Sequence, residues 1–178
     1  FVFDIDSKKI KDFADETDVN VADAEYIVSN CEYIFLGVKP QMLKTLFEKI
    51  APVIEDRTTD FTLVSMAAGV SLSSIGAMAQ VDCPIIRIMP NMPVAVGEGM
   101  ILYTVNDFVS KEDLDGFLDA MQYAGVLDRI DEDKIDAASA VSGCGPAFVF
   151  MFCEALADGA VECGLPRDKA LLYAAQTL

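Results

Sequence analysis

The sequence predicts an α/β fold, in which a doubly wound parallel β-sheet is followed by a purely helical part. Two features of the 178 residues support this prediction. Up to about Ile130, short apolar runs alternate with segments of helical period, as expected for a parallel sheet with helices on its faces. From Asp131 onward only helical periods remain. We therefore expect an α/β domain over residues 1–130 and the start of a helical domain over residues 131–178.

The expected strands are short and mostly apolar. The clearest is Glu32–Val38 (EYIFLGV), whose continuous apolar character is typical of a strand buried in a parallel sheet. Phe1–Ile5 has the character of a strand already under way at the first residue. The other strands are expected at Phe61–Met66, Pro84–Met89, Met100–Val105 and Val126–Ile130.

Helices of the α/β part are expected to begin at residues that favour helix N-termini. Ser7 and Ser110 are predicted to cap helices that run to about Ala14 and Tyr123. Pro40 is predicted to open a helix that runs to about Ile54. Two further helices are expected over Ala22–Asn30 and Ser71–Ala79.

The helical part is expected to contain one long apolar helix. Pro146 suits its first residue, Gly164 its end, and Pro166 the start of the next helix. Apolar side chains surround most of its first half, so burial on several sides is expected. The uncharged run Ala137–Cys153 is about long enough for a membrane helix, but the sequence SGCGP at 142–146 interrupts it. We interpret this run as a loop that leads into a buried helix.

Composition excludes several classes of function. The chain has 13 Lys and Arg against 29 Asp and Glu, a formal charge of −16, which disfavours nucleic-acid binding and docking on anionic membranes. It has no histidine, which excludes a Ser-His-Asp triad and a Cys-His dyad. Its five cysteines form no C-x-x-C pair, so neither a metal site nor a disulfide framework is expected. With no targeting segment at its start, the chain is expected to be a reduced, cytoplasmic protein.

Candidate site residues follow the expected strands, because ligands of such sheets bind at the carboxyl ends of the strands. Asp4 could accept hydrogen bonds from the hydroxyls of a ribose, and Lys39 could face a phosphate or carboxylate. Ala67, Ala68 and Gly69 are small enough for the close approach of a ring. Asn91 lies in a loop that Pro90 and Pro93 stiffen.

Each of these patterns also has a purely structural explanation. Asp4 could cap a turn or helix, and Lys39 could be an exposed lysine beside a helix-starting proline. The small residues at 67–69 could serve tight packing of strand against helix. The stiff loop could be a rigid turn with Arg87 in a salt bridge.

A fifth candidate comes from the helical part. Ser139 precedes a small-residue loop that leads into a helix N-terminus, where backbone N–H groups can hold an anion. The loop residues are Ser142, Gly143, Cys144, Gly145 and Pro146. The alternative is a tight helix–helix crossing that requires glycine.

In order and spacing, these motifs resemble those of pyrroline-5-carboxylate reductases. The matching stretches span Phe35 to Ala170 and read FLGVKPQ, SMAAGVSLSSI, IIRIMPNMPVAVGEGM, DAASAVSGCGPAFVF and EALADGAVECGLPRDKA. The resemblance implies an N-terminal Rossmann domain, a C-terminal helical domain that interlocks two subunits, and reduction of a cyclic imine to L-proline with NADH or NADPH. It also implies a homodimer or larger homo-oligomer and no metal.

The resemblance also implies roles for individual residues. Those along the cofactor are Val38, Lys39, Pro40, Ala67, Ala68 and Gly69, with Asn91 and Pro93 near the nicotinamide end. Ser139 matches a family hydroxyl position beside the substrate ring, where it could hydrogen-bond the ring nitrogen or relay a proton. Residues 142–146 match a family substrate stretch usually read S-G-S-G-P, in which Cys144 replaces the second serine. An acidic Asp4, where NADPH-preferring members often carry a basic or hydroxyl-rich pair, favours NADH.

The resemblance leaves parts of the family pattern outside the chain. The first strand with its glycine-rich phosphate loop is expected before Phe1, and a loop resembling S-P-G-G-T beyond Leu178. The chain is therefore expected to be a Rossmann-type sheet that lacks its first strand, followed by a truncated all-α dimerisation domain. The rival interpretations are a related imine or β-hydroxyacid reductase and a dinucleotide-binding protein without catalysis.

Overall fold

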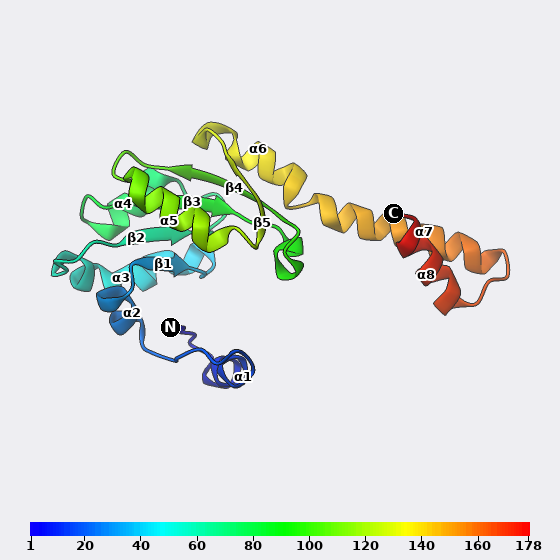
Figure 1. Cartoon of the computed structure of the whole chain (residues 1–178), viewed down its shortest axis with the longest axis horizontal. Coiled ribbons are helices and arrows are strands. Elements are labelled where there is room, and N and C mark those ends of the chain that lie inside the picture. The colour runs from blue at the N-terminus through cyan, green and yellow to red at the C-terminus, as the bar shows by residue number, and fades with distance from the viewer.

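The computed structural model describes residues 1–178 and has an α/β body with a helical arm (Figure 1). The body contains one five-stranded sheet in the order β1-β2-β3-β4-β5. Its strands are β1 (Tyr33–Leu36), β2 (Thr62–Ser65), β3 (Ile85–Met89), β4 (Gly99–Val105) and β5 (Gly125–Arg129). The α-helices are α1 (Ser7–Thr17), α2 (Ala24–Asn30), α3 (Leu43–Glu55), α4 (Leu72–Ala79), α5 (Lys111–Met121), α6 (Glu132–Ser142), α7 (Gly145–Glu162) and α8 (Arg167–Thr177). Two 3₁₀ helices, η1 (Pro40–Met42) and η2 (Met92–Val96), follow β1 and β3.

The sheet is mostly parallel, which confirms the predicted α/β fold, but the prediction of a wholly parallel sheet is wrong at β4. Strands β1, β2 and β3 are mutually parallel, β4 is antiparallel to β3, and β5 is parallel to β4. A parallel crossover needs a dozen or more residues, and the short connection from Met89 to Gly99 holds only η2. The chain therefore turns back after β3 instead of crossing over.

The N-terminal segment departs from the expected strand. Phe1–Ile5 forms no ladder, and its pairing is limited to a bridge between Val2 and Val21. A strand needs a continuous hydrogen-bonding neighbour, and here Val2 exchanges bonds only with Asn20 and Ala22. In Figure 1, α1 accordingly lies apart from the sheet.

Helix starts agree with the predictions to within a few residues. Asp6, not Ser7, caps α1, because its carboxylate accepts from the backbone N–H groups of Lys8 and Lys9 at 3.1 and 3.0 Å. Ser110 caps α5 as predicted, in a reciprocal pair with Asp113. Pro40 opens η1 rather than α3, which begins at Leu43. The long helix α7 begins one residue before Pro146.

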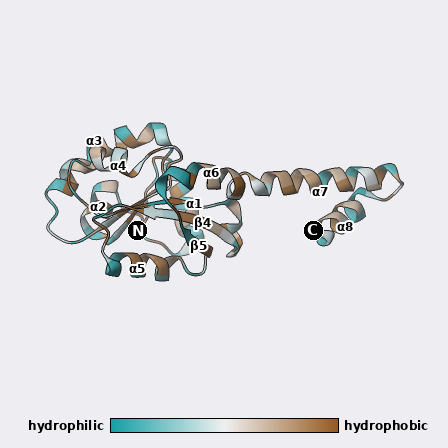
Figure 2. Ribbon diagram, turned by 90° about the horizontal axis from the view of Figure 1, so that it is seen from above, coloured by the Kyte–Doolittle hydropathy of each residue, from teal (hydrophilic) through white to brown (hydrophobic).

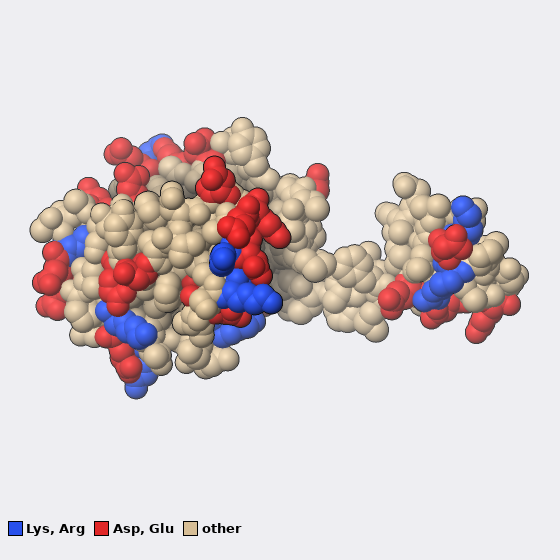
Figure 3. All heavy atoms as spheres, turned by 90° about the horizontal axis from the view of Figure 1, so that it is seen from below, with Lys and Arg blue, Asp and Glu red and all other residues tan.

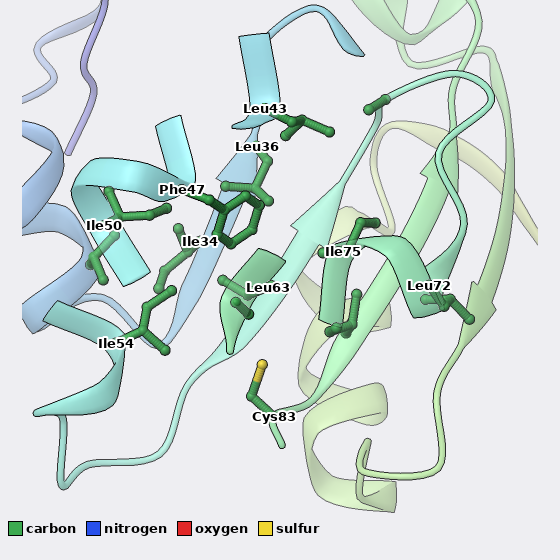
Figure 4. Packing of buried hydrophobic residues seen from close by; sticks show 14 residues of the cluster. Ile34, Leu36, Leu43, Phe47, Ile50, Ile54, Leu63, Leu72, Ile75 and Cys83 are labelled. Carbon is green, nitrogen blue, oxygen red and sulfur yellow. The ribbon is translucent and has the colours of Figure 1, made fainter. Parts of the chain in front are cut away.

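Two apolar layers cover the faces of the sheet. One face packs against α2, α3 and α4 through a cluster that includes Phe47, Leu63 and Ile75 (Figure 4). The other packs against α5 around Phe117, whose ring meets that of Tyr103 at 6.1 Å between centroids. Helices on both faces leave the carboxyl ends of β1 to β3 as an accessible edge of the sheet.

The helices α7 and α8 form an arm that projects from the body (Figures 1 and 2). They contact each other through the buried alanines Ala157, Ala170 and Ala174. The expected burial of α7 is not met within this chain, because Phe148, Phe150 and most of its other large apolar side chains are exposed. An apolar surface this extensive indicates a contact with another molecule.

By length and composition alone, the stretch Glu132–Glu162 could also cross a membrane. It is not one uninterrupted helix, because α6 ends at Ser142 and α7 begins at Gly145. Charged side chains gather on the body and at the far end of the arm, while the section between them shows few charges (Figure 3).

Candidate functional site

The loops after β1, β2 and β3 lie at one edge of the sheet, because these strands are parallel. The first holds Gly37, Val38, Lys39 and Pro40, the second Ala67, Ala68 and Gly69, and the third Asn91 and Pro93. The structure thus groups the candidate residues of three separate stretches at the edge where doubly wound sheets bind ligands.

The first two loops present open backbone to solvent. No heavy atom lies within 4 Å of the place that a β-carbon would take on Gly37 or Gly69. Gly69 also has a positive φ of 71°, a conformation that few residues other than glycine adopt. This pair of loops therefore leaves room for a flat group to approach the main chain.

The side chains of these loops differ in exposure. Lys39 and Ala68 are exposed, and Val38 and Pro40 are half-buried. Ala67 is buried in the core, and its backbone N–H donates to Ser65 Oγ at 3.4 Å. Ala67 fits the packing explanation, while Lys39, Ala68 and Gly69 face outward.

Asn91 links the third loop to the helical part. Its Nδ2 donates to the carbonyl oxygen of Ser142 at 2.9 Å, and its Oδ1 accepts from the backbone N–H of Met100 at 2.9 Å. Both ends of the amide are therefore used within the protein. The bond brings the sheet edge against the last residue of α6, where the small-residue loop begins.

The small-residue loop is a short interruption between α6 and α7, in which Gly143 and Cys144 keep helical backbone angles. Gly143 N donates to Ser139 O at 2.7 Å, and Ala147 N donates to Cys144 O at 3.1 Å. Cys144 is exposed and makes no side-chain cap for α7. Gly145 and Pro146, at the start of α7, are half-buried.

The two serines of α6 are half-buried and bonded to their own helix. Ser139 Oγ donates to Asp136 O at 2.9 Å, and Ser142 Oγ donates to Ala138 O at 3.3 Å. Each hydroxyl retains lone pairs for a further partner.

Asp4 is not joined to the other candidates. Its carboxylate accepts from the backbone N–H of Asp6 at 2.9 Å and pairs with Lys9 Nζ at 3.5 Å. The bond from Asp6 lowers the pKa of Asp4, and Lys9 lowers it further, so the group remains ionised at neutral pH. None of its hydrogen bonds reaches the loops after β1, β2 or β3.

Arg87, which the sequence suggested only as the salt-bridged residue of a rigid turn, is a buried cation of the sheet. Arg87, in the middle of β3, is 3% exposed, and its Nη2 and Nη1 lie 2.6 Å from Asp136 Oδ1 and 3.4 Å from Glu132 Oε1. The salt-bridge interpretation of Arg87 is therefore confirmed. A lone arginine in the apolar run IIRIM indicates a buried cation that needs an acidic partner, but the local sequence does not identify that partner.

The cysteines form no disulfide, and one of them is held in the thiol form. All five cysteines are free, and burial raises the pKa of Cys83 to about 11, so its thiol stays protonated. No group of three or more Cys, Asp or Glu side chains is arranged to hold a metal ion.

Comparisons with known proteins cover both parts of the chain. The sequence model of the family "Pyrroline-5-carboxylate reductase dimerisation" matches residues 132–178. The pyrroline-5-carboxylate reductase of Escherichia coli K12 is 38% identical over 172 residues, which are 96% of this chain and 62% of that protein. Across the curated relatives compared, the chain spans 54–62% of their length.

Solved structures agree with the sequence relatives. A pyrroline-5-carboxylate reductase from Coxiella burnetii superposes with a TM-score of 0.84 at 29% identity, over 96% of this chain and 63% of that one. The pyrroline carboxylate reductase of Plasmodium falciparum with NADP bound gives 0.80 at 31% identity, over 88% and 58%. Because these likenesses run from the sheet into the helical arm, this chain belongs to the pyrroline-5-carboxylate reductase family.

Proposed function

We propose that the whole protein reduces L-1-pyrroline-5-carboxylate to L-proline with NADH or NADPH, as a step of proline biosynthesis. The bond from Asn91 to Ser142 O carries this proposal, because it joins the candidate cofactor edge to the candidate substrate loop. The family membership of the chain supports it independently. We further propose a Rossmann-like NAD(P)-binding domain over residues 1–130 and the start of a substrate and dimerisation domain over residues 131–178.

The residues at the sheet edge fit a dinucleotide. Gly37 and Gly69 leave open space at the main chain, and exposed Lys39 offers a positive charge in an acidic protein. The proposed cofactor residues are Val38, Lys39, Pro40, Ala67, Ala68 and Gly69, with Asn91 and Pro93 toward the nicotinamide. When bound, the reduced nicotinamide supplies the hydride. Asn91 would act by holding its loop, since its amide is already bonded at both ends.

The proposed substrate residues are Ser139, Ser142, Gly143, Cys144, Gly145 and Pro146. Ser139 is the proposed catalytic group, because its hydroxyl can bond the ring nitrogen or relay a proton. A chain without histidine suits this chemistry, since a cyclic imine nitrogen is basic and accepts its proton readily. The protein needs mainly to orient two rings and to hold a carboxylate.

The arm is proposed to pair with that of a second copy. Its exposed apolar side chains and the match of residues 132–178 to a dimerisation family support a homodimer or larger homo-oligomer. That match also supports the proposal that another protein chain, rather than lipid, contacts the apolar stretch Glu132–Glu162. We propose that the enzyme is cytoplasmic. Because the chain has a formal charge of −16, we also propose that it binds neither nucleic acid nor membranes.

The activity is tested with the whole protein. Oxidation of NADH or NADPH, followed by absorbance, is expected to depend on added L-1-pyrroline-5-carboxylate and to release L-proline. Ser139→Ala is expected to lower kcat by about a hundredfold, the low end of the range for a lost proton-transfer group. Ser29→Ala is the matched control, because Ser29 is also a helical serine whose hydroxyl donates to its own helix, at Glu25 O.

Two outcomes would contradict the proposal. If a folded protein binds NADH or NADPH but forms no proline, the non-catalytic interpretation holds. If Ser139→Ala and Ser29→Ala behave alike, Ser139 is not the catalytic group.

The cofactor preference is proposed to depend on Asp4. An ionised carboxylate accepts bonds from a ribose 2′-hydroxyl and repels a 2′-phosphate, so the whole protein is expected to favour NADH by roughly tenfold to hundredfold in kcat/KM. Asp4→Asn is expected to remove most of this preference. Lys9 pairs with Asp4 in this structure, and its release toward a 2′-phosphate would weaken the effect.

Steady-state kinetics with both cofactors check this expectation. Asp12→Asn is the control, because Asp12 is an exposed carboxylate of helix α1, which begins three residues after Asp4. Equal use of NADH and NADPH by the unmodified protein, unchanged in Asp4→Asn, would place Asp4 away from the ribose.

A further inference from the structure

The guanidinium of Arg87 crosses from the sheet to the helical part. Arg87 lies on β3, and its two ion-pair partners, Glu132 and Asp136, lie on α6. The same Glu132 oxygen accepts from the backbone N–H of Leu72 at 2.7 Å, at the first residue of α4. One buried cation and one carboxylate thereby connect β3, α4 and α6.

Arg87 lies between polar side chains of the neighbouring strands. In the sheet register, Arg87 is paired with Ser65 on β2 and with Thr104 on β4, and all three side chains are buried. The next residues along β3, Ile86 and Ile88, belong to the apolar layer on the opposite face. A buried arginine is costly unless it is paired, so the two carboxylates of α6 are held against this row.

The pairing fixes how α6 is rotated about its axis. At 3.6 residues per turn, Glu132, Asp136 and Ser139 fall within about 60° of one another around the helix. The face of α6 that Arg87 holds against the sheet is therefore the face that carries Ser139. Asp136 links the two directly, because its carboxylate binds Arg87 and its carbonyl oxygen accepts from Ser139 Oγ at 2.9 Å.

A second tie holds the other end of the same helix. Asn91, four residues after Arg87, donates to Ser142 O at 2.9 Å. Two ties from one strand and its loop set both the position and the rotation of α6 relative to the sheet edge.

We propose that Arg87, acting through Asp136, is a positioning residue that aligns Ser139 with the cofactor edge of the sheet. This role rests on the function proposed for Ser139. Arg87 itself touches neither substrate nor cofactor. Without the ion pair to Arg87, the bond from Asn91 would still hold the end of α6, but the helix could rotate and displace Ser139. Misplacement of a reacting group by about 1 Å can lower the rate by up to about a hundredfold.

A double-mutant cycle in the whole protein tests the coupling. Asp136→Asn removes the charge that binds Arg87 and leaves the backbone carbonyl that Ser139 uses. It is expected to lower kcat about tenfold and to change KM for NADH less than about twofold. In a Ser139→Ala background the same substitution is expected to cost less than about twofold, because the group that Arg87 positions is already gone.

Asp133→Asn is the matched control, since Asp133 is an exposed carboxylate of α6 that makes no ion pair. It is expected to leave kcat within about twofold of the unmodified protein. Losses that multiply in the double variant would overturn the proposal, because Asp136 would then act independently of Ser139. Equal losses in Asp136→Asn and Asp133→Asn would overturn it as well.

Amide hydrogen exchange separates this proposal from the proposed reaction. Asp136→Asn is expected to speed exchange over residues 136–142, and Asp133→Asn is not, whether or not the protein reduces the imine. Unchanged exchange in Asp136→Asn would refute the positioning of α6 by Arg87. If the unmodified protein forms no proline but Asp136→Asn still speeds exchange, the proposed reaction and the role of Ser139 are refuted. The positioning of α6 by Arg87 would then still hold.

Discussion

Phe148→Asp is expected to convert the dimer proposed for the whole protein into monomers at micromolar concentration. Phe148 lies in the first turn of α7 and is 66% exposed in this chain. Phe150 is also exposed and points about 200° away around the helix, so this chain alone does not cover α7 on either side. A partner that surrounds the arm would bury both.

The expected loss of dimer affinity follows from the free energy of burying a phenylalanine side chain. Burying one such side chain contributes about 1.5–3 kcal/mol, and a two-fold interface contains each change twice. The loss is therefore about 3–6 kcal/mol, or roughly a hundredfold to ten-thousandfold in Kd. The buried carboxylate adds a further desolvation cost in the same direction.

Light scattering with size-exclusion chromatography measures the change. Phe108→Asp is the control, because Phe108 is a similarly exposed phenylalanine located between β4 and α5, away from the arm. An unchanged dimer in Phe148→Asp, or equal dissociation in both variants, would remove α7 from the interface.

The fold was predictable where local pattern and tertiary structure agree. The strands from Tyr33 to Arg129 and the helices between them follow apolar period and N-cap residues, as with Ser71 before α4 and Ser110 before α5. Strand direction was not predictable in the same way. An apolar run reads the same in a parallel and an antiparallel ladder, and only the length of the connection from Met89 to Gly99 distinguishes them.

The site was only partly predictable, for a related reason. Strand ends locate Lys39, Gly69 and Asn91 at one edge, because a parallel sheet places them there. The partners of a side chain depend on contacts between distant segments. The bond from Asn91 to Ser142 spans 51 residues, and the pair of Arg87 with Asp136 spans 49, so neither follows from local pattern.

Gly125→Ala is expected to destabilise the protein and to lower its melting temperature. Gly125 opens β5 opposite Gly99, the first residue of β4, and has a φ of 134°. A β-carbon on Gly125 would overlap the amide nitrogen and carbonyl oxygen of Gly99. Main-chain atoms cannot move aside as a flexible side chain can, so the two strands would have to separate where their pairing begins.

The expected cost combines backbone strain with this overlap. Strain at such a φ contributes about 1–3 kcal/mol, and steric overpacking about 1–3 kcal/mol more. Together these terms amount to about 2–6 kcal/mol, and at about 2–4 °C per kcal/mol the melting temperature is expected to fall by roughly 4–24 °C. The strand that follows the Asn91 loop would be loosened first, because the backbone N–H of Met100, next to Gly99, binds Asn91 Oδ1.

Gly76→Ala provides a control of opposite sign. Gly76 lies inside α4, where a β-carbon would meet only Ile85 Cδ1, at an ordinary contact distance of 3.7 Å. Alanine there is expected to raise stability by about 0.5–1 kcal/mol, because it restricts the unfolded chain and favours the helix. Thermal unfolding of the whole protein followed by circular dichroism compares the two variants. A melting temperature of Gly125→Ala equal to that of the unmodified protein would mean that β4 and β5 do not approach as closely as Gly99 and Gly125 indicate.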